Sequence, residues 1–136
     1  MTVAVETDEG VAVVDLDDEE VIAFEPGGAL ERAPLDVGLP LVVDADRSGA
    51  TIVAVVDRRP PLVISRDAGA TWHEAGAGLP AGRSVAISPD HPDLVVFASE
   101  NRLHVSRDGG RFWQALTVEL DAIRRVAWLG DGPDLG

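Results

Sequence analysis

Short apolar segments separated by turn residues recur along the whole chain. They are rich in valine, isoleucine or leucine and are bounded by glycine, proline, aspartate or asparagine, which is typical of strands joined by closely spaced turns. No window of helical length carries an apolar stripe with a period of 3.6 residues, and residues 116–125 fit a loop that runs into a strand. We therefore expect an all-β fold. The predicted strands cover residues 2–6, 11–16, 41–44, 51–56, 62–65, 84–88, 94–98, 103–106 and 125–129.

An eight-residue motif occurs twice, 41 residues apart. The segment SRDAGATW at 65–72 recurs as SRDGGRFW at 106–113, and the same offset aligns residues 83–94 with residues 124–135 without a gap. Serine and aspartate side chains bond the backbone of tight turns, and glycine supplies positive φ there. A tryptophan then offers a large apolar anchor at the start of the next strand. The period indicates a repeated supersecondary unit.

The motif resembles the Asp-box, or BNR repeat, of sialidases and of many unrelated β-propellers. In that family it forms the turn between the third and fourth strands of a four-stranded antiparallel blade. The first copy fits the whole pattern Ser-x-Asp-x-Gly-x-Thr-Trp, and the second has Phe112 at the threonine position. Residues 15–22 resemble a decayed third copy. The resemblance implies structural roles in these turns for Ser65, Asp67, Gly69, Thr71, Trp72, Ser106, Asp108, Gly110, Trp113 and Asp17.

The repeat predicts about three blades in a single domain that spans residues 1–136. One blade is split between residues 124–136 and 2–24, the second covers 39–74, and the third covers 83–115. Propellers usually need about four to eight blades to close, and open strand edges invite association. We expect a six-bladed ring completed by homodimerisation, in which the C-terminal strand of each chain completes the N-terminal blade of the other. A trimer or a larger hetero-assembly is the alternative.

Charge and composition narrow the classes of partner. The net charge is −13, with 24 acidic residues against 11 basic residues, which argues against binding to nucleic acid or to an anionic membrane. No apolar run approaches the roughly 20 residues of a membrane span. The N-terminal segment lacks the basic region of a signal peptide. The chain has no cysteine, which agrees with a reducing compartment, so we expect a cytoplasmic location.

No cofactor and no metal site is expected from the sequence. The acidic run 15–20 lacks the ligand spacing of a calcium loop. The three histidines, His73, His91 and His104, lack the spacing of zinc ligands.

A candidate ligand face follows from the propeller arrangement. In propellers, the loops from fourth to first strands and those from second to third strands share one face. Here the loops from fourth to first strands correspond to residues 25–40, 74–82 and 114–123. The loops from second to third strands correspond to residues 7–10, 57–61 and 99–102. An arginine-lined channel on that face would receive a carboxylate or a phosphate. Solvated charges paired with the surplus acids are the simpler interpretation. The candidates are Arg58, Arg59, Arg83, Glu100, Arg102, Arg124 and Arg125.

The resemblance to sialidases does not carry their activity, because fold and function are separable. Those enzymes use a tyrosine nucleophile, and this chain has no tyrosine. We therefore expect a non-catalytic propeller that binds a partner protein or acts as a scaffold and associates with itself. A carbohydrate-binding, lectin-like propeller is the alternative, because fucose-binding propellers are also built from short subunits. A glycosidase-related enzyme comes third, since no pair among the carboxyl groups stands out.

Overall fold

The computed structural model of the protein describes residues 1–31 and 35–130, and these residues form strands and no helix. They build three four-stranded antiparallel sheets, so the predicted all-β class is confirmed. The first, which we call the split sheet, has the order β12-β1-β2-β3. Its strands are β1 (Thr2–Thr7), β2 (Gly10–Asp15), β3 (Glu20–Pro26) and β12 (Ile123–Gly130).

The other two sheets are each formed by four consecutive strands. The β4–β7 sheet contains β4 (Val42–Ser48), β5 (Thr51–Val56), β6 (Leu62–Ser65) and β7 (His73–Ala75). The β8–β11 sheet contains β8 (Ser84–Ile87), β9 (Val95–Ala98), β10 (Arg102–Ser106) and β11 (Gln114–Glu119). Each of the nine strands predicted from the sequence corresponds to one of these strands.

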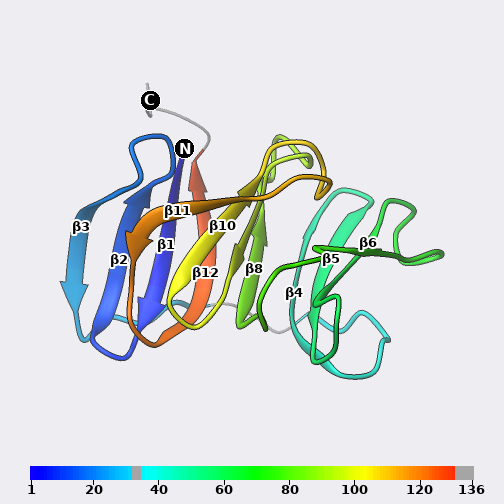
Figure 1. Ribbon diagram of the computed structural model, residues 1–136, viewed down its shortest axis with the longest axis horizontal. Coiled ribbons are helices and arrows are strands. Elements are labelled where there is room, and N and C mark those ends of the chain that lie inside the picture. The colour runs from blue at the N-terminus through cyan, green and yellow to red at the C-terminus, as the bar shows by residue number, and fades with distance from the viewer. Residues whose placement is uncertain (32–34, 131–136) are drawn as a thin grey trace.

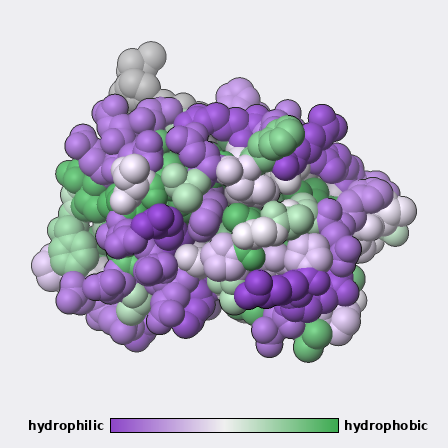
Figure 2. Space-filling view, viewed as in Figure 1, coloured by the Kyte–Doolittle hydropathy of each residue, from purple (hydrophilic) through white to green (hydrophobic). Residues whose placement is uncertain are grey.

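The apolar pattern left out three strands, the outer strands β3, β7 and β11, which the resemblance implied as the fourth strand of each blade. The interpretation of residues 114–123 as a loop was wrong, because Gln114–Glu119 pairs with β10 along the sheet edge. Outer strands lie at the rim and bury few side chains. β3 is exposed throughout, and its exposed apolar residues are Val21, Ile22 and Phe24. Figure 2 shows hydrophobic side chains at the edge of the molecule where β3 lies.

The split sheet joins the two ends of the chain. β12 pairs antiparallel with β1, with Val126 opposite Val5 and Ala127 opposite Ala4 (Figure 1). The expected exchange of this strand between two chains is therefore not what the structure contains, because β12 lies on β1 of its own chain. The start of β12 is fixed by Leu120 N, which donates to Asn101 O (3.0 Å), and by Ile123 N, which donates to Glu100 O (2.8 Å). Residues 131–136, which the sequence assigned to the same blade, lie outside the described residues.

The three sheets stand side by side with the β8–β11 sheet in the middle (Figure 1). One core lies between the split sheet and the middle sheet and includes Val3, Val5, Leu103 and Val126. A second core lies between the middle sheet and the β4–β7 sheet and is centred on Phe97. The outer face of the β4–β7 sheet is covered by Leu35, Val37 and Leu39, which precede β4.

Hydrogen bonds between side chains and backbone connect the first strands β4, β8 and β12. Ser84 Oγ donates to Asp44 Oδ2 (2.5 Å), and the same carboxylate oxygen accepts from Val85 N (3.1 Å). Asp46 Oδ2 accepts from Ile87 N (3.0 Å). On the other side of β8, Val126 N donates to Ser84 Oγ (3.0 Å). These bonds satisfy backbone amides that no neighbouring strand pairs, so Ser84 links all three sheets.

Replacing Ser84 tests this linkage. Ser84 is fully buried, so Ser84→Ala leaves the partly buried Asp44 carboxylate oxygen and the Val126 amide without their hydroxyl partner, and we expect a loss of about 1–3 kcal/mol in the free energy of unfolding. Urea denaturation measures it. Ser99→Ala is the control, because Ser99 Oγ donates only to Arg102 O within one sheet, and it should cost less. Equal losses in the two variants would contradict the linkage.

Candidate functional site

The first motif forms a turn between β6 and β7, which we call the first Ser-Asp turn (residues 65–72). Asp67 Oδ1 accepts from Ser65 Oγ and from Thr71 N, both at 2.8 Å, and Asp67 Oδ2 accepts from Thr71 Oγ1 at 2.5 Å. Gly69 N donates to Ser65 Oγ (2.8 Å). Gly69 has a φ of +93°, which explains the glycine at this position. Trp72 packs on the outer face of the β4–β7 sheet.

The second Ser-Asp turn (residues 106–113) repeats these bonds between β10 and β11. Asp108 Oδ1 accepts from Ser106 Oγ (2.8 Å), Arg111 N (3.1 Å) and Phe112 N (3.0 Å). Gly110 N donates to Ser106 Oγ (2.8 Å), and Trp113 Nε1 donates to Gly110 O (3.0 Å). Phe112 brings no hydroxyl donor. Its side chain is 79% exposed.

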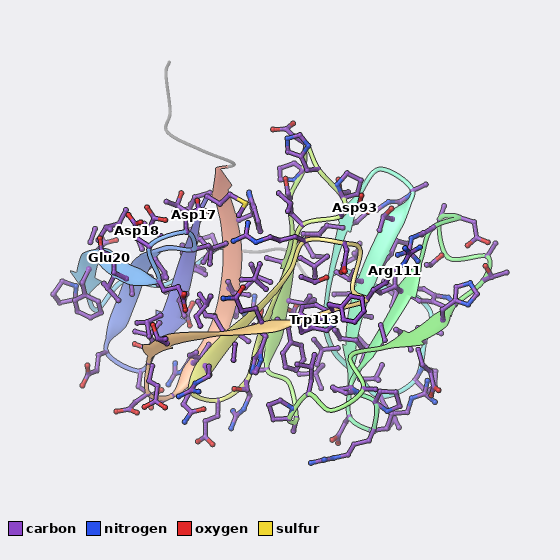
Figure 3. The ribbon with its side chains drawn as sticks, turned by 45° about the horizontal axis from the view of Figure 1, so that its top comes forward. Asp17, Asp18, Glu20, Asp93, Arg111 and Trp113 are labelled. Atoms are coloured by element: carbon purple, nitrogen blue, oxygen red, sulfur yellow. The ribbon has the colours of Figure 1, made fainter. Side chains whose placement is uncertain are left out.

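The third turn, at residues 15–22, connects β2 to β3 and is built differently. Asp15 occupies the serine position, and its Oδ1 accepts from Asp17 N (2.9 Å) and Asp18 N (3.2 Å). Asp17 instead faces the chain's own amino terminus, with Met1 N at 2.9 Å from Oδ2, and Arg107, with Nη2 at 3.6 Å from Oδ1. Figure 3 shows Asp17, Asp18 and Glu20 on this turn. Asp17 thus ties the split sheet to the middle sheet.

The turn carboxylates are held in their charged form. The hydroxyl and amide of Thr71 lower the pKa of Asp67 to about 2. The Phe112 amide, followed by the Ser106 hydroxyl, lowers the pKa of Asp108, and the amino terminus lowers the pKa of Asp17. A carboxylate stabilised by several donors is a poor proton donor near neutral pH. These three groups therefore act as structural acceptors.

The predicted ligand face is only partly assembled. Arg58 and Arg59 line a hollow of about 130 Å³ together with Ala81 and Gly82. Arg83 and Glu100 line a second hollow of about 290 Å³ that also reaches Ala81. Arg83 Nη2 lies 3.9 Å from Glu100 Oε1. Four of the predicted residues thus gather around residues 80–83.

The remaining predicted arginines lie elsewhere. Arg102 is paired with Glu119 of β11, and Arg124 donates to Asp8 Oδ1 through Nε (2.7 Å). Arg125 lies opposite Glu6 in the β12–β1 ladder. Arg102 and Arg124 therefore have carboxylate partners from the surplus acids, which is the simpler interpretation that the composition favoured.

A larger hollow was not predicted from the sequence. It has a volume of about 360 Å³ and lies between the two Ser-Asp turns, with Arg66, His73 and Arg111 on its walls. A signal was present, because Arg66 and Arg107 occupy the same position of the repeated motif.

Within residues 1–31 and 35–130, no group of three histidine, aspartate or glutamate side chains is placed to hold a metal ion. The described part of the chain also has no helix of the length and apolar character needed to cross a membrane.

Comparisons with known proteins do not assign a family. No protein-family model matches the chain, and no curated protein matches it in sequence.

A half-buried histidine lies near the second core. His104 on β10 packs edge-on against Phe97, with ring centroids 5.8 Å apart. Its Nε2 is buried and has no hydrogen-bond partner among the described residues. Burial lowers the pKa of His104 below 6.5, and the charge of Arg102 lowers it further. The imidazole is therefore neutral at pH 7.

Near pH 6, acidification should destabilise the protein mainly through protonation of His104 and less through Asp67. Below pH 6.5 the unfolded chain binds a proton at His104 that the folded chain resists, so stability falls as the pH drops from 6.5 toward the lower folded pKa. His104→Leu should flatten this dependence in urea denaturation series, whereas the exposed His91→Gln should retain it. An unchanged slope in His104→Leu would contradict this account.

The stabilisation from Asp67 is lost at lower pH. Its pKa of about 2 in the folded state lies below the ordinary 3.8, so its contribution is complete above pH 3.8 and disappears as the pH falls through about 2. Asp67→Asn should be less stable than the parent protein at pH 7 and equally stable at the acid end. Thermal unfolding across this range measures the difference. A constant difference at every pH would show that ionisation of Asp67 does not matter.

Proposed function

We propose that this protein is a non-catalytic, cytoplasmic scaffold or binding protein of the Asp-box propeller type, in which two copies of the chain close one six-bladed ring. Each copy contributes three sheets. The proposal differs from the sequence-based expectation in one respect, because each split sheet is completed by its own β12.

The observation that carries the proposal is a difference in burial between positions that the 41-residue offset aligns in the sequence. Ser84 lies on β8, the first strand of the middle sheet, Ser88 directly follows it, and both are 0% exposed. The offset aligns Val43 with Ser84 and Leu129 with Ser88, and in the structure each of these two apolar residues stands at a register shift of its ladder. Val43 on β4 is 49% exposed and Leu129 on β12 is 55% exposed. The two end strands thus expose apolar side chains, whereas the aligned serines of the middle sheet are covered by neighbouring sheets on both sides.

A second copy supplies the missing neighbours. β8 lies between β4 and β12, whereas β4 and β12 each lie at one end of the row of sheets. A two-fold arrangement that places β12 of one copy beside β4 of the other covers both ends at once, because a two-fold interface is self-complementary. Exposed apolar side chains at such ends are typical of interaction surfaces.

The turn chemistry supports a non-catalytic role. Asp67 and Asp108 are the acidic residues of the repeated motif, and their oxygens accept hydrogen bonds from their own turns. A general acid or base at neutral pH needs a pKa near the working pH, and the pKa values of both carboxyls are shifted away from it.

Carbohydrate binding is the second candidate, and one observation favours it. The exposed ring of Phe112 adjoins a hollow of about 250 Å³ that Asp108, Gln114 and Arg107 also line. An apolar face beside a few polar groups is the usual composition of a small-molecule site. Reproducible binding on a glycan array that Phe112→Ala abolishes would establish this function, and silence on the array would exclude it for the sugars present.

The mass in solution tests the ring. Sedimentation at micromolar concentration should give twice the 14.3 kDa of the chain. Val43→Glu and Leu129→Glu each place a charge in the covered interface, and burial of an unpaired charge is strongly unfavourable, so both variants should sediment as monomers with an unchanged circular dichroism spectrum.

Ile22→Glu is the matched control. The exposed fraction of Ile22, 53%, is close to the 55% of Leu129. Ile22, however, lies on the outer strand β3 and not on a first strand at an end of the row. It should leave the mass unchanged. A compact monomer of the parent chain, or dissociation by Ile22→Glu alone, would overturn the proposal.

A further inference from the structure

The hollow between the two Ser-Asp turns has the composition of a ligand site. It is lined by Ile64, Ala75 and the glycines 76 and 110, and by the polar residues Arg66, His73, Glu74 and Arg111. Strand alternation places His73 on the same face as Ile64, since the two residues are paired across β6 and β7. Glu74 is paired with Val63, which lies on the opposite face of the sheet. The paired strands therefore turn the His73 imidazole toward the hollow, and Glu74 also contributes to its lining.

Arg66 is held in place at the rim of this hollow. Its Nη2 donates to Gly109 O at 2.8 Å, so the guanidinium spans from the first Ser-Asp turn to the second. A Cβ at Gly109 would stand 2.8 Å from Arg66 Nη2, and a Cβ at Gly110 would stand 2.6 Å from Ile64 Cδ1. The two glycines thus leave room for the arginine and for the hollow itself.

The second copy of the motif shows which group an arginine at the position of Arg66 contacts. Arg107 occupies the same place in the repeat, at the boundary between the middle sheet and the split sheet. There it faces the Asp17 carboxylate of the next turn, with Nη2 at 3.6 Å from Oδ1. At the boundary of Arg66 the next turn offers no such group, because Asp108 accepts from its own turn. In the described part of the chain, neither Arg66 nor Arg111 forms an ion pair.

Two acidic residues, Glu74 and Asp93, lie near this boundary. A Cβ at Gly109 would lie 3.2 Å from Asp93 Oδ1, and Figure 3 shows Asp93 and Arg111 on neighbouring loops beside the β4–β7 sheet. Among residues 1–31 and 35–130, Asp93 forms no ion pair with Arg66. Its charge sets a limit on how strongly the hollow attracts an anion.

We propose that this hollow binds a carboxylate group carried on a short apolar chain, with Arg66 and Arg111 as its guanidinium partners and Ile64 and Ala75 as the apolar contact. Guanidinium groups match the geometry of a carboxylate and form its strongest hydrogen bonds. The carboxylate comes from a small aliphatic acid or from an acidic side chain of a peptide. No residue of β4 or β12, the strands that would close the ring, lines the hollow. The site is therefore independent of the proposed assembly.

Amide chemical shifts of the isotope-labelled protein test the site. The probes are succinate, an acetylated and amidated pentapeptide with a central glutamate, the same peptide with glutamine, and inorganic phosphate at equal ionic strength. Saturable shifts at Ala75, Gly76, Gly109 and Gly110 with succinate or with the glutamate peptide support the proposal, and the tighter of the two identifies the source. Sedimentation of the same sample reports the assembly separately.

Variants make the test specific. Arg111→Gln should weaken binding by at least about tenfold, and Asp93→Asn should strengthen it because a repulsive charge is removed. Arg47→Gln is the matched control, since Arg47 also donates to a glycine carbonyl, Gly49 O, but lines no part of the hollow. Phosphate binding as tight as carboxylate binding, an unchanged affinity in Arg111→Gln, or the absence of saturable shifts up to about 10 mM would overturn the proposal.

Discussion

The pairing of β12 with β1 is the interaction on which the rest of the structure depends. It brings the two ends of the chain into one sheet, and it places Val126 beside Val3 and Val5 in the core that this sheet shares with the middle sheet. The same strand is bonded to β8 through the Val126 amide and the Ser84 hydroxyl. Without β12, β1 would be an open edge, and the split sheet would lose its inner contact with the middle sheet.

This arrangement produces a row of three sheets in which the middle sheet is packed on both faces, the outer face of the β4–β7 sheet is covered in part by residues 35–39, and both end strands expose apolar side chains. The middle sheet has a hydrophobic core on each face. The end strands β4 and β12 expose Val43 and Leu129, and the sheet edges carry Arg-rich hollows. We propose that the ends bind a second copy and that the hollow between the Ser-Asp turns binds a small acidic ligand. The two features lie on different parts of the molecule, so assembly and binding can be separated.

The sequence predicts the inner strands well because their side chains are buried. β5 and β6 have the predicted bounds, since Thr51–Val56 and Leu62–Ser65 are continuous apolar segments between turn residues. β3, β7 and β11 escaped prediction from the apolar pattern because ladder hydrogen bonds, and not burial, define them: β7 has three residues, and β11 buries only Leu116. The Arg102–Glu119 pair depends on β11 and was missed with it. The 41-residue repeat located both Ser-Asp turns, but the reach of Arg66 to the next turn required the packing of the sheets.

The central claim is that a second copy of this chain covers the exposed ends of β4 and β12. Isotope-filtered nuclear Overhauser measurements on a mixture of labelled and unlabelled chains test it most directly, because they detect contacts between copies alone. The account predicts intermolecular signals from the methyl groups of Val43 to β12 of the other copy and from those of Leu129 to β4. A mixture in which these methyl groups show contacts only within their own chain would contradict it.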